Sequence, residues 1–285
     1  MNKLLIFLSL SLISLFAKPT VTVSILPQSY FVQKIAGDTL NINVMVTPGN
    51  SPATYEPKPK QMIQLENSVA YLAIGVPFEA SWLPKFQASY PNLPIIHTEK
   101  DIQKQSIASH QHTNAVPHDS TQEILDPHIW LDPLHVKTMS RAIATALSNL
   151  YPDRKTLYEN NLHSFLQELD TLHVEIQTTL ANVTRKKFMV YHPSWGYFAT
   201  RYGLEQEAIE IEGKEPKPSV LVKLIQEAKD ENIHLLIVQP QFSQKSAKVI
   251  ADAINGKVIA IDHLSPNWEQ ELRKTATLFA QTLRP

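Results

Sequence analysis

The sequence contains no cysteine and only seven glycines among its 285 residues. The absence of cysteine excludes disulfides, thiolate metal ligands and a lipid-modified cysteine. No GxGxxG or GxxxxGK[ST] motif occurs, which argues against a nucleotide bound on a Gly-rich phosphate loop. An excess of one charge sign is also missing, because 26 Lys and Arg stand against 27 Asp and Glu. The sequence therefore predicts no basic surface for nucleic acid or anionic lipid.

Long apolar runs are absent except at the start of the chain. Residues 1–17 combine the positive Lys3, an apolar run and the small Ala17, which is typical of a secretory signal peptide. The run is shorter than the ~20 residues that a membrane span requires. We expect cleavage just before Lys18, but Leu15 is a poor residue three places before that cut and leaves the exact bond open. The expected product is an exported, soluble protein.

Residues 151–180 carry the clearest periodic pattern. Apolar side chains recur there at steps of three and four, the period of one buried helix face, at Leu157, Tyr158, Leu162, Phe165, Leu166, Leu169, Leu172, Ile176 and Leu180. An uninterrupted helix from Asp153 to Leu180 would be about 40 Å long. We interpret this helix as a rigid strut that joins two lobes. The alternative is a long core helix within one domain.

Short β-branched runs alternate with helical patterns on both sides of this segment, which predicts parallel sheets. Strands are predicted at residues 21–25, 42–46, 70–74 and 94–97, and again at 188–191, 208–212, 235–238 and 258–261. The predicted fold class is α/β, with two lobes of mainly parallel four-stranded sheet flanked by helices and joined by one long backbone helix. The expected divisions are an N-terminal lobe at residues 18–150 with a mobile His-bearing loop at 99–125, a connecting helix at 151–182 and a C-terminal lobe at 183–285.

Three side chains that can bind a metal lie where a strand or loop ends and a helix begins: His128, His192 and Asp262. Two imidazoles and a carboxylate suit Zn²⁺ first, and Mn²⁺ or Fe²⁺ after it. One of them precedes the strut and two follow it, so the site would lie between the lobes. Their spacing matches no local metal motif. Each also has a structural interpretation: a hydrogen bond to a neighbouring Asp for His128, one to a backbone carbonyl for His192, and a turn or cap for Asp262.

Several longer motifs run along the whole mature chain, among them PATYEPKPKQM, DPHIWLDP, YHPSWGYFATRYGL, EIEGKEPKPSVLVKLI and AIDHLSPNW. With these motifs the chain resembles the substrate-binding proteins of bacterial zinc and manganese ABC transporters, nearest the ZnuA-like zinc branch with its TroA-type fold. The resemblance implies two lobes joined by one backbone helix, with a metal in the cleft between them. It also implies that the family's metal ligands fall on His128 of the DPH motif, on His192 of the HPxxGYF motif and on Asp262.

The resemblance fails at one ligand position. The family usually has His between the Pro and Thr of its P-H-T-Y-E-P motif, whereas this chain has Ala53 there. A methyl group cannot bind a metal, so another group must complete the site. The alternatives are water, a histidine of the following loop or a nearby side chain, which gives as candidates His110, His112, His118, Glu56 and His263. His263 is itself a departure, because relatives often have Pro at that position.

The resemblance implies a periplasmic receptor rather than an enzyme. We expect a monomer that captures Zn²⁺ and delivers it to the permease of an ABC transporter, with a stiff strut that limits the lobes to small tilts. One alternative is a protein that binds a metal chelate, or an adhesin, on the same scaffold. Another is a zinc-dependent hydrolase, since two His, one Asp and a water are also an open catalytic pattern, although no residue is marked as a general base.

Overall fold

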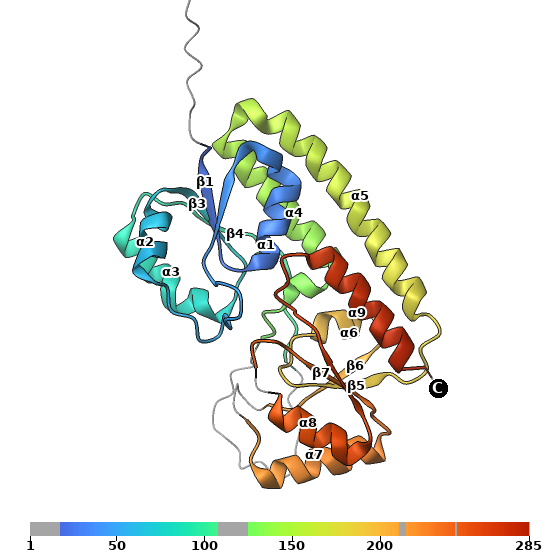
Figure 1. Cartoon of the computed structure of the whole chain (residues 1–285). Coiled ribbons are helices and arrows are strands. Elements are labelled where there is room, and N and C mark those ends of the chain that lie inside the picture. Colours follow the sequence, from blue (N-terminus) through green and yellow to red (C-terminus); the bar gives the residue numbers. More distant parts are fainter. Residues whose placement is uncertain (1–17, 108–124, 211–214, 243, 285) are drawn as a thin grey trace, which may run out of the picture.

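The computed structural model describes residues 18–107, 125–210, 215–242 and 244–284. It contains two four-stranded sheets, and every strand pairing in them is parallel. A long helix, α5 (Lys155–Leu180), connects the two halves of the chain (Figure 1), so the predicted fold class is confirmed. The predicted signal peptide, residues 1–17, lies outside the described residues. Within the described ranges, no helix is long and apolar enough to cross a membrane.

The first sheet has the strand order β2-β1-β3-β4. Its strands are β1 (Thr20–Val23), β2 (Asn41–Val44), β3 (Ser68–Ala73) and β4 (Ile95–His97). Val21 of the central strand pairs with Ile42 on one side and Ala70 on the other. The accompanying helices are α1 (Leu26–Ala36), α2 (Pro59–Glu66), α3 (Pro77–Ser89) and α4 (Pro133–Leu150). Helices cover both faces of this sheet, which explains why β3 contains the apolar run VAYLA and why Thr22 of β1 is fully buried.

The second sheet repeats this order as β6-β5-β7-β8. Its strands are β5 (Lys187–Val190), β6 (Glu205–Ala208), β7 (Leu235–Val238) and β8 (Lys257–Ala260). Its helices are α6 (Gly196–Tyr202), α7 (Pro218–Asp230), α8 (Lys245–Ile254) and α9 (Trp268–Thr282). The strand predicted at 208–212 lies earlier, at Glu205–Ala208. The prediction missed its start because β6 is an edge strand that begins with the polar sequence EQE, and charged residues are common at sheet edges.

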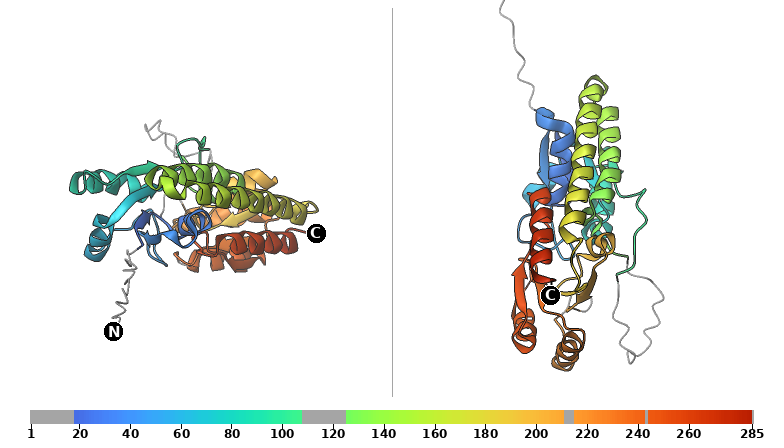
Figure 2. Two further views of the ribbon diagram at one scale, coloured as in Figure 1. Left: turned by 90° about the horizontal axis from the view of Figure 1, so that it is seen from above. Right: turned by 90° about the vertical axis from the view of Figure 1, so that its right-hand side faces the viewer.

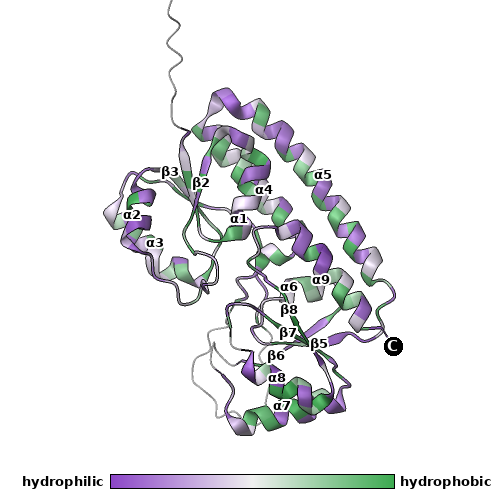
Figure 3. Cartoon of the chain, in the orientation of Figure 1, coloured by the Kyte–Doolittle hydropathy of each residue, from purple (hydrophilic) through white to green (hydrophobic). Residues whose placement is uncertain are grey.

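Helix α5 lies along α4, α1 and α9 and so contacts both halves of the molecule (Figures 1 and 2). Most of the predicted apolar face is buried, and polar residues alternate with it along the helix (Figure 3). Leu157 is the exception, because its side chain is 44% exposed. The helix begins at Lys155 rather than earlier, since Tyr151 has an extended φ of −135° and a 3₁₀ turn, η3 (Pro152–Arg154), precedes it.

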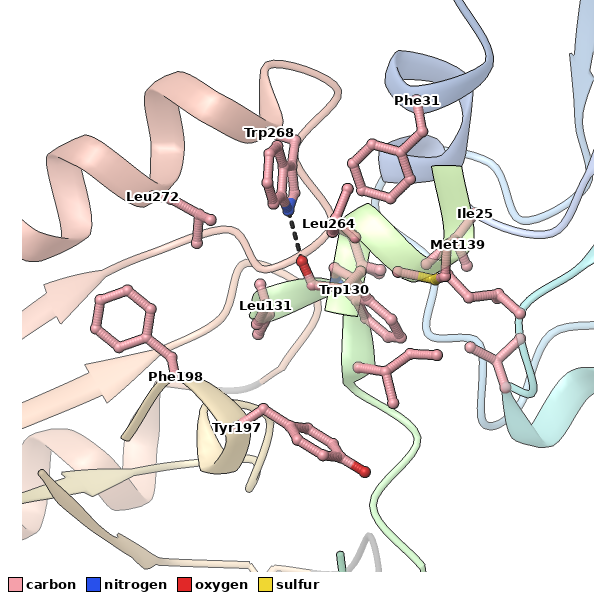
Figure 4. Packing of buried hydrophobic residues seen from close by; sticks show 14 of the residues in the cluster. Ile25, Phe31, Trp130, Leu131, Met139, Tyr197, Phe198, Leu264, Trp268 and Leu272 are labelled. Carbon is pink, nitrogen blue, oxygen red and sulfur yellow. Dashed lines mark hydrogen bonds between the residues drawn. The ribbon is translucent and has the colours of Figure 1, made fainter. Parts of the chain in front are cut away.

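One hydrophobic core is shared by both lobes. It runs from β1, β3, α1 and α4 past the buried face of α5 to β5, α6, β7 and α9. At its centre Trp130 lies among Ile25, Met139 and Leu264, and its backbone carbonyl accepts a 2.7 Å hydrogen bond from Trp268 Nε1 (Figure 4). A smaller cluster fills the space beneath α7 and α8. The orientation of the lobes is therefore fixed by buried side chains as well as by the strut.

Candidate metal centre

Polar side chains follow all four strands of the second sheet at their carboxyl ends. His192 comes two residues after β5, Glu210 two after β6, Gln239 directly after β7 and His263 three after β8. Loops at this edge of a parallel sheet are the usual place for a ligand. Gln239 fixes the first of them, because its amide donates to the His192 carbonyl at 2.7 Å and accepts from the His192 N–H at 3.2 Å. The sheet therefore presents two imidazoles at one edge.

His128 approaches the same edge from an earlier part of the chain. It lies just before the 3₁₀ turn η2 (Ile129–Leu131), which leads into α4. Trp130 of this turn donates from Nε1 to the His263 carbonyl at 2.7 Å, and its ring stacks on the His263 ring with centroids 6.3 Å apart. The turn that carries His128 is thus tied directly to the loop that carries His263.

Together these elements bring three imidazoles into one group. One nitrogen each of His128, His192 and His263 lies within 4.8 Å of the other two. The Nε2 atoms of His128 and His192 are 3.1 Å apart. Two nitrogens bound to one tetrahedral Zn²⁺, each about 2.0–2.1 Å from the ion, are separated by roughly 3.3 Å. The spacing of the two histidines is therefore that of neighbouring ligands on a metal ion.

Buried carboxylates set the tautomers of two of these histidines. His128 Nδ1 donates to Asp126 Oδ1 at 2.7 Å, and His192 Nδ1 donates to Glu210 Oε1 at 2.5 Å. A proton on each Nδ1 leaves a free lone pair on each Nε2, and these are the two atoms that face each other. Carboxylates that accept from the second ring nitrogen are the common support of metal-binding histidines, because they fix the ring and raise its basicity.

Burial favours the neutral form of His128 and His263. It lowers the pKa of His128, although the nearby Asp126 carboxylate opposes the shift. It lowers the pKa of His263 well below the usual value, and the neighbouring His128 and His192 lower it further. His263 Nδ1 is also buried without a hydrogen-bond partner among the described residues. Neutral, desolvated imidazoles are ready to bind a metal because neither a proton nor a water shell has to be removed first.

Asp262 lies beside this group rather than within it. Its Oδ1 accepts from Gln241 Nε2 at 2.8 Å and from the Leu264 N–H at 3.0 Å. Asp262 also lines a recess of about 230 Å³ between the lobes, opposite residues 46–50. Among the described His, Asp and Glu side chains, the group that could hold one ion contains the three histidines and not Asp262. The assignment of Asp262 as a ligand stays a prediction.

The structure also bears on the place left open by Ala53. Ala53 and Glu56 are both exposed, and Glu56 is not part of the imidazole group. His110, His112 and His118 lie outside the described residues. Of the candidates that the structure describes, His263 is the one that the fold places beside His128 and His192.

Comparisons with known proteins identify the family of this chain. The family described as ZnuA, zinc-uptake complex component A, periplasmic, matches residues 21–282. The chain belongs to this family. The resemblance read from the motifs is thereby confirmed, and the ZnuA family is one of metal-binding receptors that serve transport.

Two relatives are described as binding zinc, and a third shares the fold. A crystal structure of a zinc-bound ZnuA deletion mutant shares 38% identity, with a TM-score of 0.86 over 94% of this chain and 99% of that one. The zinc-binding lipoprotein AdcA of Streptococcus pneumoniae strain R6 is 24% identical over 90% of this chain, which spans about half (52%) of the length of that relative. The laminin-binding protein Lmb of Streptococcus agalactiae, titled a bifunctional adhesin and metal transporter, has the same fold at 21% identity, with a TM-score of 0.81 over 93% of this chain and all of that one.

In this ZnuA-family chain, the sequence indicated part of the centre. A hydrogen bond from His128 to Asp126 or Asp132 was one interpretation of the DPH motif, and the structure shows the bond to Asp126. His263 was only one of several candidates, and Glu210 was not recognised as a partner of His192. For Glu210 no local signal existed, because its partner lies 18 residues away on a neighbouring strand.

Proposed function

We propose that this chain is a periplasmic receptor that captures Zn²⁺ with the three imidazoles of His128, His192 and His263 and delivers it to an ABC transporter permease. The observation that carries the proposal is the 3.1 Å approach of two Nε2 atoms whose Nδ1 protons are held by buried carboxylates. Three nitrogen ligands favour zinc over manganese, which prefers oxygen. Water or the neighbouring Asp262 would occupy the fourth position.

A bare ion fits this site better than a chelate or an organic substrate. One nitrogen of each imidazole lies within 4.8 Å of the other two, which is the spacing of ligands around a single ion. The zinc-bound ZnuA relative supports the same choice of cargo. A hydrolase remains an outcome of the test, since three His and a water also form a catalytic zinc site.

Titration calorimetry on the metal-stripped protein tests this proposal. We expect one-to-one binding of Zn²⁺, weaker binding of Mn²⁺ and a loss of more than roughly 100-fold in zinc affinity for His192→Ala, beyond the ~10–100-fold cost of losing an outer-shell partner. His163→Ala, on the exposed face of α5, is the matched control. Wild-type protein that binds zinc no better than micromolar would contradict capture of the bare ion and favour the chelate or adhesin alternatives.

Two further variants identify the third ligand. If His263 binds the ion, His263→Ala should lose as much affinity as His192→Ala, whereas Asp262→Asn should lose no more than roughly tenfold, the low end for an outer-shell residue. The reverse order would make Asp262 the ligand and His263 its neighbour. Hydrolysis of ester or peptide substrates by the wild type, lost in His128→Ala, would contradict the receptor proposal and favour a zinc-dependent hydrolase.

A further inference from the structure

We propose that Tyr197 and Gly196, at the start of α6, are positioning residues for the metal ligand His128. They hold Asp126 against the second lobe, and Asp126 in turn fixes the tautomer and orientation of the His128 ring. This inference rests on the proposed function, because it concerns the same centre. It adds two residues that touch none of the three imidazoles described above.

The carboxylate of Asp126 is the link between α6 and the ligand. Its Oδ1 accepts from both the backbone N–H of His128, at 2.9 Å, and the ring Nδ1 of His128, at 2.7 Å. Its Oδ2 accepts from Gln105 Nε2 at 3.4 Å. The side chain is 1% exposed. Because the carboxylate is buried, any displacement of Asp126 must rotate the His128 ring or break its hydrogen bond.

Gly196 leaves the space that the carboxylate occupies. A Cβ atom at this position would lie 2.7 Å from Asp126 Oδ2 and 2.8 Å from Gln105 Nε2. Real Cβ atoms do not approach other atoms so closely, and the two groups in the way are part of the network that holds His128. The requirement for glycine is one of space. Alanine is the better helix former, so a cost of Gly196→Ala would come from this contact and not from helix propensity.

The Tyr197 hydroxyl fixes the backbone on which Asp126 stands. It donates to the Asp126 carbonyl at 2.9 Å and accepts from the Gln105 N–H at 3.1 Å. The Asp126 N–H in turn donates to the Gln105 carbonyl at 2.8 Å. One hydroxyl group thus joins the chain segments that contain Gln105 and Asp126 to helix α6. The Tyr197 side chain is 4% exposed, so loss of the hydroxyl would leave two buried backbone groups without a partner.

Tyr197→Phe and Tyr202→Phe form a matched pair for the test. Both remove one hydroxyl from α6, but the Tyr202 hydroxyl contacts His173 of α5 at 3.2 Å and nothing near Asp126. We expect Tyr197→Phe to weaken zinc binding about tenfold, the lower end for partners of metal-binding histidines, and Gly196→Ala to weaken it more. Tyr202→Phe should bind zinc as the wild type does. The absorption spectrum of bound Co²⁺ should change in Tyr197→Phe and not in Tyr202→Phe.

Nitrogen NMR of the histidine rings in the metal-free protein separates positioning from general damage. In the wild type, His128 should be the Nδ1–H tautomer, with its signals assigned by their loss in His128→Ala. Tyr197→Phe should mix the tautomers of His128 and leave those of His192 unchanged.

Wild-type zinc affinity in Tyr197→Phe, or an unchanged His128 tautomer beside a lost affinity, would overturn the positioning role. A wild-type protein that fails to bind zinc would overturn the proposed function instead, while the tautomer of His128 in the two variants would still test the positioning.

Discussion

Glu79 is a buried carboxyl group that is not part of the imidazole centre but affects the stability of the fold. It is 4% exposed and accepts from the backbone N–H groups of Ile74 and Gly75, at 2.9 and 2.7 Å, and from the Ser24 hydroxyl. Burial raises its pKa from 4.5 to about 7, although these hydrogen bonds oppose the shift. The folded protein therefore keeps a proton on Glu79 at a pH where the unfolded chain has released it.

This shift predicts a loss of stability as the pH rises. Between pH 4.5 and about 7 the folded state binds more protons than the unfolded state, so the free energy of unfolding falls with increasing pH. The contribution of Glu79 is about 3 kcal/mol over this window, at 1.36 kcal/mol per pKa unit. Urea unfolding of the metal-free protein at a series of pH values should show a flatter profile for Glu79→Gln than for the wild type. Glu66→Gln, at an exposed position on α2, is the control, and parallel profiles for wild type and Glu79→Gln would contradict the assignment.

The sequence identified His128 and His192 through their motifs, and the fold brings their rings together. It did not identify His263 as their neighbour, because the approach of three residues from separate parts of the chain depends on the register of β8 and on the hydrogen bond from Trp130. A local sequence pattern predicts contacts only between residues that are close along the chain. It therefore could not predict the contact of Glu210 with His192, because the two residues follow different strands.

At the scale of elements, Asp132 begins α4 and also connects it to α6. Its Oδ1 accepts from the Leu134 N–H at 2.9 Å, and Pro133 occupies the first helical position. Its Oδ2 accepts from Arg201 Nε and Nη2 at 2.9 and 2.6 Å. One side chain thus caps the helix that follows His128 and fixes it to the helix that carries Tyr197.

Replacement of Asp132 should therefore cost more than the loss of an ordinary cap. We expect Asp132→Ala to lower the free energy of unfolding by roughly 2 kcal/mol, of which about 1 kcal/mol is the cap and the rest the charge-assisted bonds to the partly exposed Arg201. Asp153→Ala, whose carboxylate is 77% exposed and 3.9 Å from Arg154, should change it by less than about 0.5 kcal/mol. Urea unfolding of both metal-free variants measures the difference. Equal effects would show that the Asp132 network contributes no more than a surface ion pair.

The periodic pattern predicted the strut well because nearly all of its buried face is apolar, from Tyr158 to Leu180. It predicted Leu157 wrongly, since that side chain is 44% exposed although the next residue, Tyr158, is fully buried in the core. The pattern of β6 failed as well. An edge strand contributes few side chains to the core, and its sequence therefore carries little of the apolar signal on which strand predictions rest.

At the scale of the whole molecule, the lobes share one core and are also joined by polar contacts along α5. Lys34 of α1 pairs with Glu168 of α5, Tyr30 of α1 donates to Glu269 of α9, and Arg273 of α9 pairs with Glu175 of α5 at 2.7 Å. Ring contacts add to them, since Phe31 lies edge-on to Trp268 with centroids 5.0 Å apart. Wide opening of the lobes would have to expose this buried surface.

Zinc should therefore change the overall dimensions of the protein very little. Small-angle scattering of the metal-free and zinc-loaded protein should give radii of gyration that agree within error, because a packed core resists hinge motion. The zinc-loaded His192→Ala variant serves as the control for effects of the added salt. A clear compaction on zinc binding, absent from that variant, would show that the lobes move as hinged bodies and would contradict the rigid arrangement.

The two indole rings beside the centre give the protein an optical property of its own. Trp130 is stacked on the His263 ring, and Trp268 is hydrogen-bonded to the Trp130 carbonyl, so both chromophores sense the electric field at the imidazoles (Figure 4). An ion with a double positive charge entering that field changes the emission of a nearby indole. Under the proposed function, binding and release of Zn²⁺ would therefore change the intrinsic fluorescence of the protein, and its transfer to the proposed permease could be timed without attaching a label.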